Sequence, residues 1–101
     1  MPLVYCGACS HAPGITARAE RADTQTRQAL VNIERILKEA GSGLDRVARC
    51  NLYLTDYNRL AEANEVYAEF FRTHKPAKTG VGVSQLWAGA LIEIEVTAVR
   101  A

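Results

Sequence analysis

The segment KPAKTGVGV, residues 75–83, places one charged side chain, that of Lys78, at the start of an apolar run interrupted by glycines. A lysine in this position has two interpretations. It is a charge that acts in catalysis or binds an anion, or it is a solvated residue at the start of a strand. The segment alone leaves both interpretations open, and the second is the ordinary one.

A second group of residues with possible chemistry consists of the cysteines, Cys6, Cys9 and Cys50. An odd number of cysteines in a chain without a secretion signal argues against a disulfide framework. Cys6 and Cys9 match a C-x-x-C spacing, but the apolar segment around them is typical of a strand, where these positions point to opposite faces. His11 and His74 are isolated and offer no metal-ligand spacing, so we predict no metal site.

Length and charge limit the classes of function. The chain of 101 residues fits a single domain, residues 1–101, and its 12 basic and 11 acidic residues leave a formal net charge of +1. This balance disfavours binding to nucleic acid or to an anionic membrane surface. No apolar stretch has the length of a transmembrane helix, and the N-terminus lacks the pattern of a signal peptide. We therefore expect a soluble, cytoplasmic protein with no nucleic-acid or membrane partner.

Hydrophobic periodicity predicts the elements that must position Lys78. Two helices are predicted, one before Gly41, which is expected to end it, and one after Asp56, which is expected to cap it. Pro76 prevents the second helix from continuing. A turn at residues 87–90 is expected to join the last two strands. The predicted elements are strands at 3–9, 47–55, 79–86 and 91–99, a helix at 23–40 and a second helix after residue 56.

Two of the predicted strands alternate strictly between apolar and polar positions, as half-buried strands do. The positions expected to face the helices are Ala48, Cys50, Leu52 and Leu54 in one strand and Ile92, Ile94, Val96 and Ala98 in the other. Tyr67, Phe70 and Phe71 belong to the apolar stripe of the second helix, so they are assigned to the core rather than to a ligand site.

The order of the elements predicts an α+β domain, a mixed β-sheet with two helices on one face. The other face of such a sheet is uncovered, and here it is neither fully polar nor fully apolar. A face of this kind usually needs a partner subunit, and polar residues inside such an interface can line a small site. We predict a homo-oligomer with sites between subunits.

Two spaced segments, THKPAKTGVGV and GALIEIEVTAV, resemble the signature of the RidA/YjgF/YER057c/UK114 family, which reads approximately H-K-P-A-R-[ST]-x-V-x-V and then L-P-x-G-x-x-[IV]-E-[IM]-E. The match extends back through LYLTDYNRLAEANEVY, QTRQALVNIERILKEAG and the strand around Gly7, so it covers nearly the whole chain. There are two differences. Lys78 replaces the arginine of the active imine deaminases, and Gly80 stands where Cys, Thr or Ala is common. The family's extra N-terminal strand has no counterpart before LVYCGAC, so part of the usual pocket wall is expected to be absent.

The resemblance implies a chorismate-mutase-like fold and a homotrimer with ligand sites in the clefts between neighbours. It also implies hydrolysis of small enamine and imine intermediates to 2-oxo acids and ammonia, without a metal or an organic cofactor. The partner would be a small-molecule carboxylate, so a fixed cation must hold it while a positioned water attacks the imine carbon.

The resemblance also implies roles for particular residues. Lys78 matches the arginine that anchors the carboxylate, and Glu93 matches the glutamate that orients the water, so these two are the expected catalytic residues. The substrate-binding positions it implies are Gly7, Asn64, Thr79 and Gly80.

Three alternatives stay open. The first is a non-catalytic family member that binds small carboxylic or 2-oxo acids, which the loss of the arginine favours. The second is a tautomerase in which Pro2, exposed after removal of Met1, acts as a general base. The third is RNA cleavage, which the lack of a basic stripe and of an aromatic stacking platform disfavours.

Overall fold

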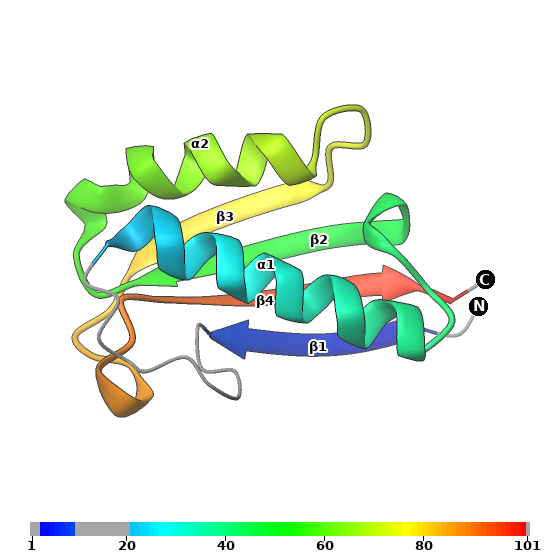
Figure 1. Ribbon diagram of the computed structural model, residues 1–101, viewed down its shortest axis with the longest axis horizontal. Helices are drawn as coiled ribbons and strands as arrows, with labels where there is room; N and C mark the ends of the chain where they lie inside the picture. The colour runs from blue at the N-terminus through cyan, green and yellow to red at the C-terminus, as the bar shows by residue number, and fades with distance from the viewer. Residues whose placement is uncertain (1–2, 10–20, 101) are drawn as a thin grey trace.

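The computed structural model describes residues 3–9 and 21–100, without the side chains of residues 6–9 and 88. Four strands, two α-helices and three short 3₁₀ turns make up this part of the chain (Figure 1). In chain order they are β1 (Leu3–Cys9), α1 (Ala22–Glu39), η1 (Leu44–Arg46), β2 (Val47–Leu54), η2 (Tyr57–Arg59), α2 (Leu60–Phe70), β3 (Ala77–Gly82), η3 (Trp87–Gly89) and β4 (Ile92–Val99). Neither α-helix of the described part combines the length and apolar character needed to span a bilayer.

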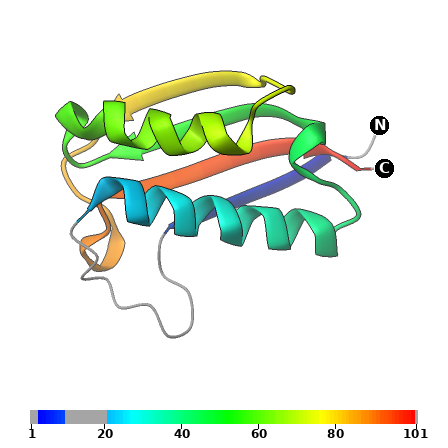
Figure 2. The ribbon, with the colours of Figure 1, turned by 45° about the horizontal axis from the view of Figure 1, so that its top comes forward.

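The four strands form one mixed sheet in the order β1-β4-β2-β3. β4 is antiparallel to both β1 and β2, and β2 is parallel to β3. Both helices cover the same face of this sheet, with α1 over β1 and β4 and α2 on the side of β3 (Figures 1 and 2). The predicted α+β architecture, a mixed sheet with two helices on one face, is therefore confirmed.

The core lies between the sheet and the two helices. Along β4, the residues predicted to face the helices are at most 1% exposed: Ile92, Ile94, Val96 and Ala98. They pack in one cluster with fully buried residues of α1: Ala29, Leu30, Ile33 and Leu37. The alternating apolar residues of β4 and the apolar stripe of α1 thus pack together in a single buried layer.

The end of α1 follows the predicted stop signal, whereas the predicted cap of the second helix lies one short turn before α2, whose own N-cap residue is Arg59. Gly41 has a φ of 78° and follows α1, and the Ser42 N–H donates to the Leu37 carbonyl over 2.8 Å. This left-handed glycine closes the last turn of the helix, a conformation that a residue with a Cβ adopts at a cost. Asp56 accepts a hydrogen bond of 3.1 Å from the Asn58 N–H and so caps η2, the 3₁₀ turn that leads into α2.

The third strand differs from its prediction. β3 starts at Ala77 and ends at Gly82, rather than running from residue 79 to 86, so Lys78 lies inside the strand instead of just before it. The expected turn is present, because the Ala90 N–H donates to the Trp87 carbonyl over 3.2 Å. However, β3 and β4 are not neighbours, since β2 lies between them. Apolar character alone placed the strand too late and did not reveal this crossover.

The start of β2 also corrects the prediction for Ala48, which is exposed. The register of β2 against β4 shifts between Val47 and Arg49, so Val47 takes the buried position that strict alternation assigned to Ala48. An irregularity of this kind adds one unpaired residue to the strand, so the residues before it point to the opposite faces from those that strict alternation predicts. Cys50, Leu52 and Leu54 occupy the buried face as predicted.

Candidate functional site

Lys78 lies on the edge strand β3 and its side chain turns toward the helix-covered face of the sheet. Its neighbour in the register of β2 is Cys50, which is fully buried beneath the helices. The Lys78 ammonium donates a hydrogen bond to the Oδ1 atom of Asn64 and lies 4.4 Å from the centre of the Tyr67 ring. Two residues of α2 therefore fix the end of the lysine side chain, and one of them, Asn64, is a predicted substrate-binding residue.

The surroundings of Lys78 act on its charge in opposite directions. Burial of the amine against α2 lowers the pKa of Lys78 below its usual value, and the nearby Cys50 raises it. The face of the Tyr67 ring attracts an ammonium group. Burial also raises the pKa of Tyr67, so its hydroxyl stays neutral and adds no charge to the site. The result is an amine that is held in place and has part of its surface open to solvent.

The two residues after Lys78 fall on different faces. Gly80 shares the helix side with Lys78, and a Cβ added there would lie 3.2 Å from a methyl group of Leu60. The glycine thus lets Leu60 pack close to the edge strand. Thr79 is paired with Asn51, lies on the uncovered face and is exposed. Of Thr79 and Gly80, both predicted to bind substrate, only Gly80 lies on the same face of the sheet as Lys78.

Glu93 lies on the uncovered face of the sheet, as its alternation with Ile92 and Ile94 predicts. It is half-buried and pairs with Tyr53 of β2 in the register. β1 is the neighbour of β4 on the edge opposite to β2, and its residue Gly7 pairs with Glu95 of β4. Lys78 and Glu93 thus belong to opposite faces of one sheet, and one small molecule cannot contact both side chains within a single chain.

A hydrogen-bonded cluster on the uncovered face was not predicted from the sequence. The Asn51 amide and the Tyr53 hydroxyl each donate to the same Glu95 carboxylate oxygen over 3.1 Å. The Asn51 and Tyr53 hydrogen bonds lower the pKa of Glu95, and the hydrogen bond to Glu95 raises the pKa of Tyr53. The signal that could have found this cluster is the shared strand face, since β2 and β4 are direct neighbours.

The Glu95 cluster predicts a pH dependence of stability. Because the folded-state pKa of Glu95 is lowered, its contribution is present above the unfolded-state pKa of about 4.3 and is lost as the pH falls through the folded-state pKa. We expect the free energy of unfolding of the parent protein to fall more steeply below pH 5 than that of Glu95→Gln. Urea unfolding at a series of pH values measures this, with Glu65→Gln on the exposed side of α2 as the control. Parallel pH curves for the parent and Glu95→Gln would contradict the prediction.

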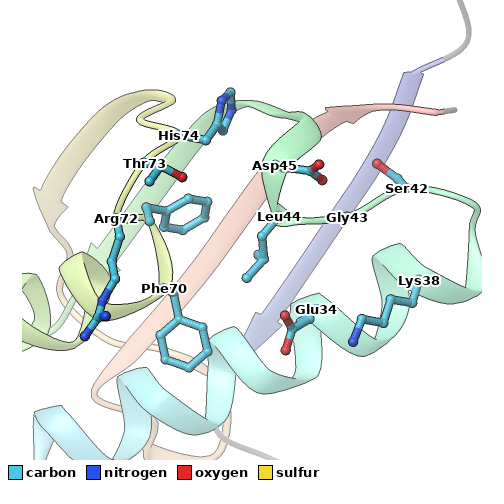
Figure 3. A pocket seen from close by; sticks show the side chains of 11 residues that line it. Glu34, Lys38, Ser42, Gly43, Leu44, Asp45, Phe70, Arg72, Thr73 and His74 are labelled. Carbon is cyan, nitrogen blue, oxygen red and sulfur yellow. The ribbon is translucent and has the colours of Figure 1, made fainter.

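A separate pocket of about 440 Å³ opens where the C-terminal ends of α1 and α2 approach η1. Figure 3 shows its lining, which carries charges of both signs. The His74 ring nitrogen lies 2.6 Å from the Val47 carbonyl oxygen and fixes one side of this pocket. None of the predicted site residues lines it, so it is distinct from the site at β3. The lining comprises Glu34, Lys38, Ser42, Gly43, Leu44, Asp45, Phe70, Phe71, Arg72, Thr73 and His74.

The side chains of the described residues form no group of three or more His, Cys, Asp or Glu that could hold a metal ion. The predicted strand around Cys6 and Cys9 is present as β1, but the side chains of these two cysteines lie outside the described part of the structure. The prediction that they bind no zinc therefore stays a prediction. Cys50 is fully buried and is not part of a disulfide in the described structure.

Similarity to known proteins extends along almost the whole chain. Residues 3–100 match the family model described as Endoribonuclease L-PSP. A RutC family protein of Pyrococcus horikoshii is 50% identical over 76 residues, which cover 75% of this chain and 60% of that protein. The matched regions cover 57% to 60% of the first curated relatives, so the chain spans less than two thirds of their length.

Solved structures show the same fold. The crystal structure of yeast Mmf1 superposes with a TM-score of 0.93 at 36% identity, covering 98% of this chain and 80% of that one. The crystal structure of E. coli TdcF with bound serine gives a TM-score of 0.89 at 30% identity, covering 98% and 81%. By sequence over residues 3–100 and by fold, the chain belongs to the Endoribonuclease L-PSP family, which is the YjgF/RidA family.

Proposed function

We propose that this chain hydrolyses small imine and enamine compounds to 2-oxo acids and ammonia, with turnover weakened by Lys78 in place of the family's arginine. The observation that carries the proposal is the position of Lys78, a cation held by Asn64 and the Tyr67 ring on an edge strand that is open to a ligand. The structural relative TdcF has been crystallised with serine, a small molecule that carries a carboxylate. A carboxylate bound at Lys78 agrees with both facts.

A site that uses both Lys78 and Glu93 requires a second copy of the chain, because the two residues lie on opposite faces of the sheet. The uncovered face offers a surface for such a copy. Leu3 and Tyr5 of β1 are 48% and 71% exposed, and their register partners Val99 and Thr97 place them on the same face as Glu95. We propose a homotrimer in which Lys78 of one subunit and Glu93 of its neighbour border each site.

The assembly is predicted to be a trimer that persists at micromolar concentration. Burial of the amphipathic sheet face supplies the driving force, since a single chain of this size exposes Leu3 and Tyr5 to water. Light scattering coupled to size exclusion measures the mass. The Tyr5→Glu variant should shift the mass toward the monomer, while Tyr57→Glu, at an exposed tyrosine in η2, should not. A stable monomer of the parent protein would exclude a shared site.

In the proposed reaction, the ammonium of Lys78 binds the substrate carboxylate and fixes the position of the imine carbon. A water molecule held by Glu93 adds its oxygen to that carbon, and Glu93 accepts the proton that the water loses. The nitrogen receives that proton from Glu93 and a second proton from the new hydroxyl, the C–N bond breaks, and ammonia leaves as the carbonyl forms. The chain supplies charge, orientation and a base, so no cofactor enters these steps.

The second candidate function is binding of small carboxylic or 2-oxo acids without turnover, which the replacement of arginine by Lys78 favours. A dehydratase that releases 2-iminobutanoate, with the 2-oxo acid detected in a coupled assay, separates the two functions. Faster release of 2-oxobutanoate in the presence of the protein supports hydrolysis. Calorimetric binding of 2-oxobutanoate without faster release from 2-iminobutanoate would leave only the binding function. If the protein neither bound 2-oxobutanoate nor accelerated its release, both proposed functions would be contradicted.

Two sequence-based alternatives have no support from the described residues. Pro2, on which the tautomerase depends, lies outside the described part of the structure. The family description names an endoribonuclease, but the chain's formal net charge of +1 offers little attraction for a phosphate backbone.

A further inference from the structure

We propose that the ε-amine of Lys78 forms a reversible covalent Schiff base with small 2-oxo acids. This inference rests on the proposed function, because it requires a 2-oxo acid to bind at the same site. It adds a covalent step that an arginine at this position cannot perform, since a guanidinium is always protonated and offers no free lone pair. The exchange of arginine for lysine thus changes the chemistry of the site as well as its affinity.

The geometry presents the amine to a ligand. The Nζ atom is tethered on one side by Asn64 Oδ1 and on another by the Tyr67 ring, 4.4 Å from its centre. Lys78 as a whole residue is exposed on a strand at the outer edge of the sheet, where a small molecule can approach it. A lysine that is anchored in this way loses less freedom on reaction than one that moves freely in solvent.

The charges around Nζ permit a neutral amine. In the described part of the chain, none of the ion pairs includes Lys78. The groups that face it are Asn64 and Tyr67 from α2 and Cys50 from β2. Burial lowers the pKa of Lys78 and outweighs the opposing effect of Cys50, while Tyr67 stays neutral. The unprotonated fraction at a given pH is therefore larger than that of an ordinary surface lysine, and this fraction is the nucleophile.

The step balances without an oxidant or reductant. The Nζ lone pair attacks the 2-oxo carbon and forms a C–N bond, and the carbonyl oxygen becomes the hydroxyl of a carbinolamine. One amine proton has moved to the oxygen in forming that hydroxyl, which then takes up the second amine proton and leaves as water, so that a C=N double bond remains. The product is itself an imine of a 2-oxo acid, the class of compound that the proposed reaction hydrolyses. Water positioned by Glu93 can thus reverse the adduct, so it accumulates only when it is trapped.

The test traps the adduct on the full chain with pyruvate and cyanoborohydride, followed by peptide mapping in a mass spectrometer. The lysines of the sequence are Lys38, Lys75 and Lys78, which gives two internal controls in the same molecule. Lys75 is the closer match, since it lies three positions before Lys78 and its amine donates to the Phe71 carbonyl. Lys78 should be labelled at least about tenfold faster than either, because its amine is held in place by Asn64 and the Tyr67 ring and because burial lowers its pKa.

Two variants sharpen this test. Lys78→Arg should keep the binding of 2-oxobutanoate but lose the fast-labelled site, and Asn64→Leu should slow labelling of Lys78 by releasing its amine. Equal labelling of the three lysines of the parent protein would overturn the covalent step. In that case the proposed function still stands if Lys78→Ala fails to bind 2-oxobutanoate. Undiminished binding by Lys78→Ala would overturn the proposed function and, with it, the site on which the adduct depends.

Discussion

The Leu30→Ala variant is expected to lose about 3–5 kcal/mol of unfolding free energy, the range found when a fully buried leucine is truncated and the cavity does not collapse. Leu30 is 0% exposed and lies in the core cluster between α1 and the sheet, together with Ile33 of α1 and Ile94 of β4. These neighbours belong to rigid elements, so the space left by the side chain is not refilled. A loss of this size approaches the whole stability of a small domain.

The neighbouring residue supplies a matched control, because Val31 is in the same helix and is 44% exposed. Val31→Ala removes apolar volume at the surface and improves helix propensity, so its effect should stay within about 0.5 kcal/mol. Urea unfolding followed by circular dichroism measures both variants. All proteins must be compared at one concentration, since assembly contributes to apparent stability. Similar losses for the two variants would show that α1 is not packed on the sheet as described.

Periodicity predicted the core because burial on one face leaves a direct mark in the sequence. Ile92, Ile94, Val96 and Ala98 alternate, and all are buried. Ala48 does not follow this alternation, because the strand register shifts between Val47 and Arg49. No particular residue type marks such a shift in the sequence. The order of the strands is likewise decided by long-range pairing: a run of apolar residues shows that β3 exists but not that β2 separates it from β4.

The candidate site was only partly predictable. The resemblance to the family brought Lys78 and Asn64 together, and the structure places them in contact. Tyr67 was assigned to the core, and the residue is indeed only 8% exposed, yet its ring lies under the Lys78 amine. Its position three residues after Asn64 puts both on one face of α2, which was the available signal. No sequence pattern showed that Lys78 and Glu93 lie on opposite faces, because that depends on the pairing partner of β3.

Lys78→Arg is expected to raise imine hydrolysis by about tenfold to a few hundredfold, and Lys78→Ala to abolish both hydrolysis and 2-oxo acid binding. A guanidinium is a planar fork that binds both oxygens of a carboxylate and fixes its orientation, whereas an ammonium is a hydrated point charge. The surroundings suit the exchange, since Asn64 Oδ1 can accept from a guanidinium and the Tyr67 ring offers it a stacking face.

The measurement is the rate of 2-oxobutanoate formation from dehydratase-generated 2-iminobutanoate, together with calorimetric binding of 2-oxobutanoate. Lys75→Arg is the matched control, because it makes the same exchange three positions away, where the amine contacts only a helix-end carbonyl in the described structure. Its rate should equal that of the parent protein. Because charge is conserved in both exchanges, a gain confined to Lys78→Arg reports orientation of the carboxylate rather than general electrostatic attraction. If Lys78→Ala binds 2-oxobutanoate as tightly as the parent, then Lys78 is a solvated residue of an edge strand, and the ligand site lies elsewhere on the molecule.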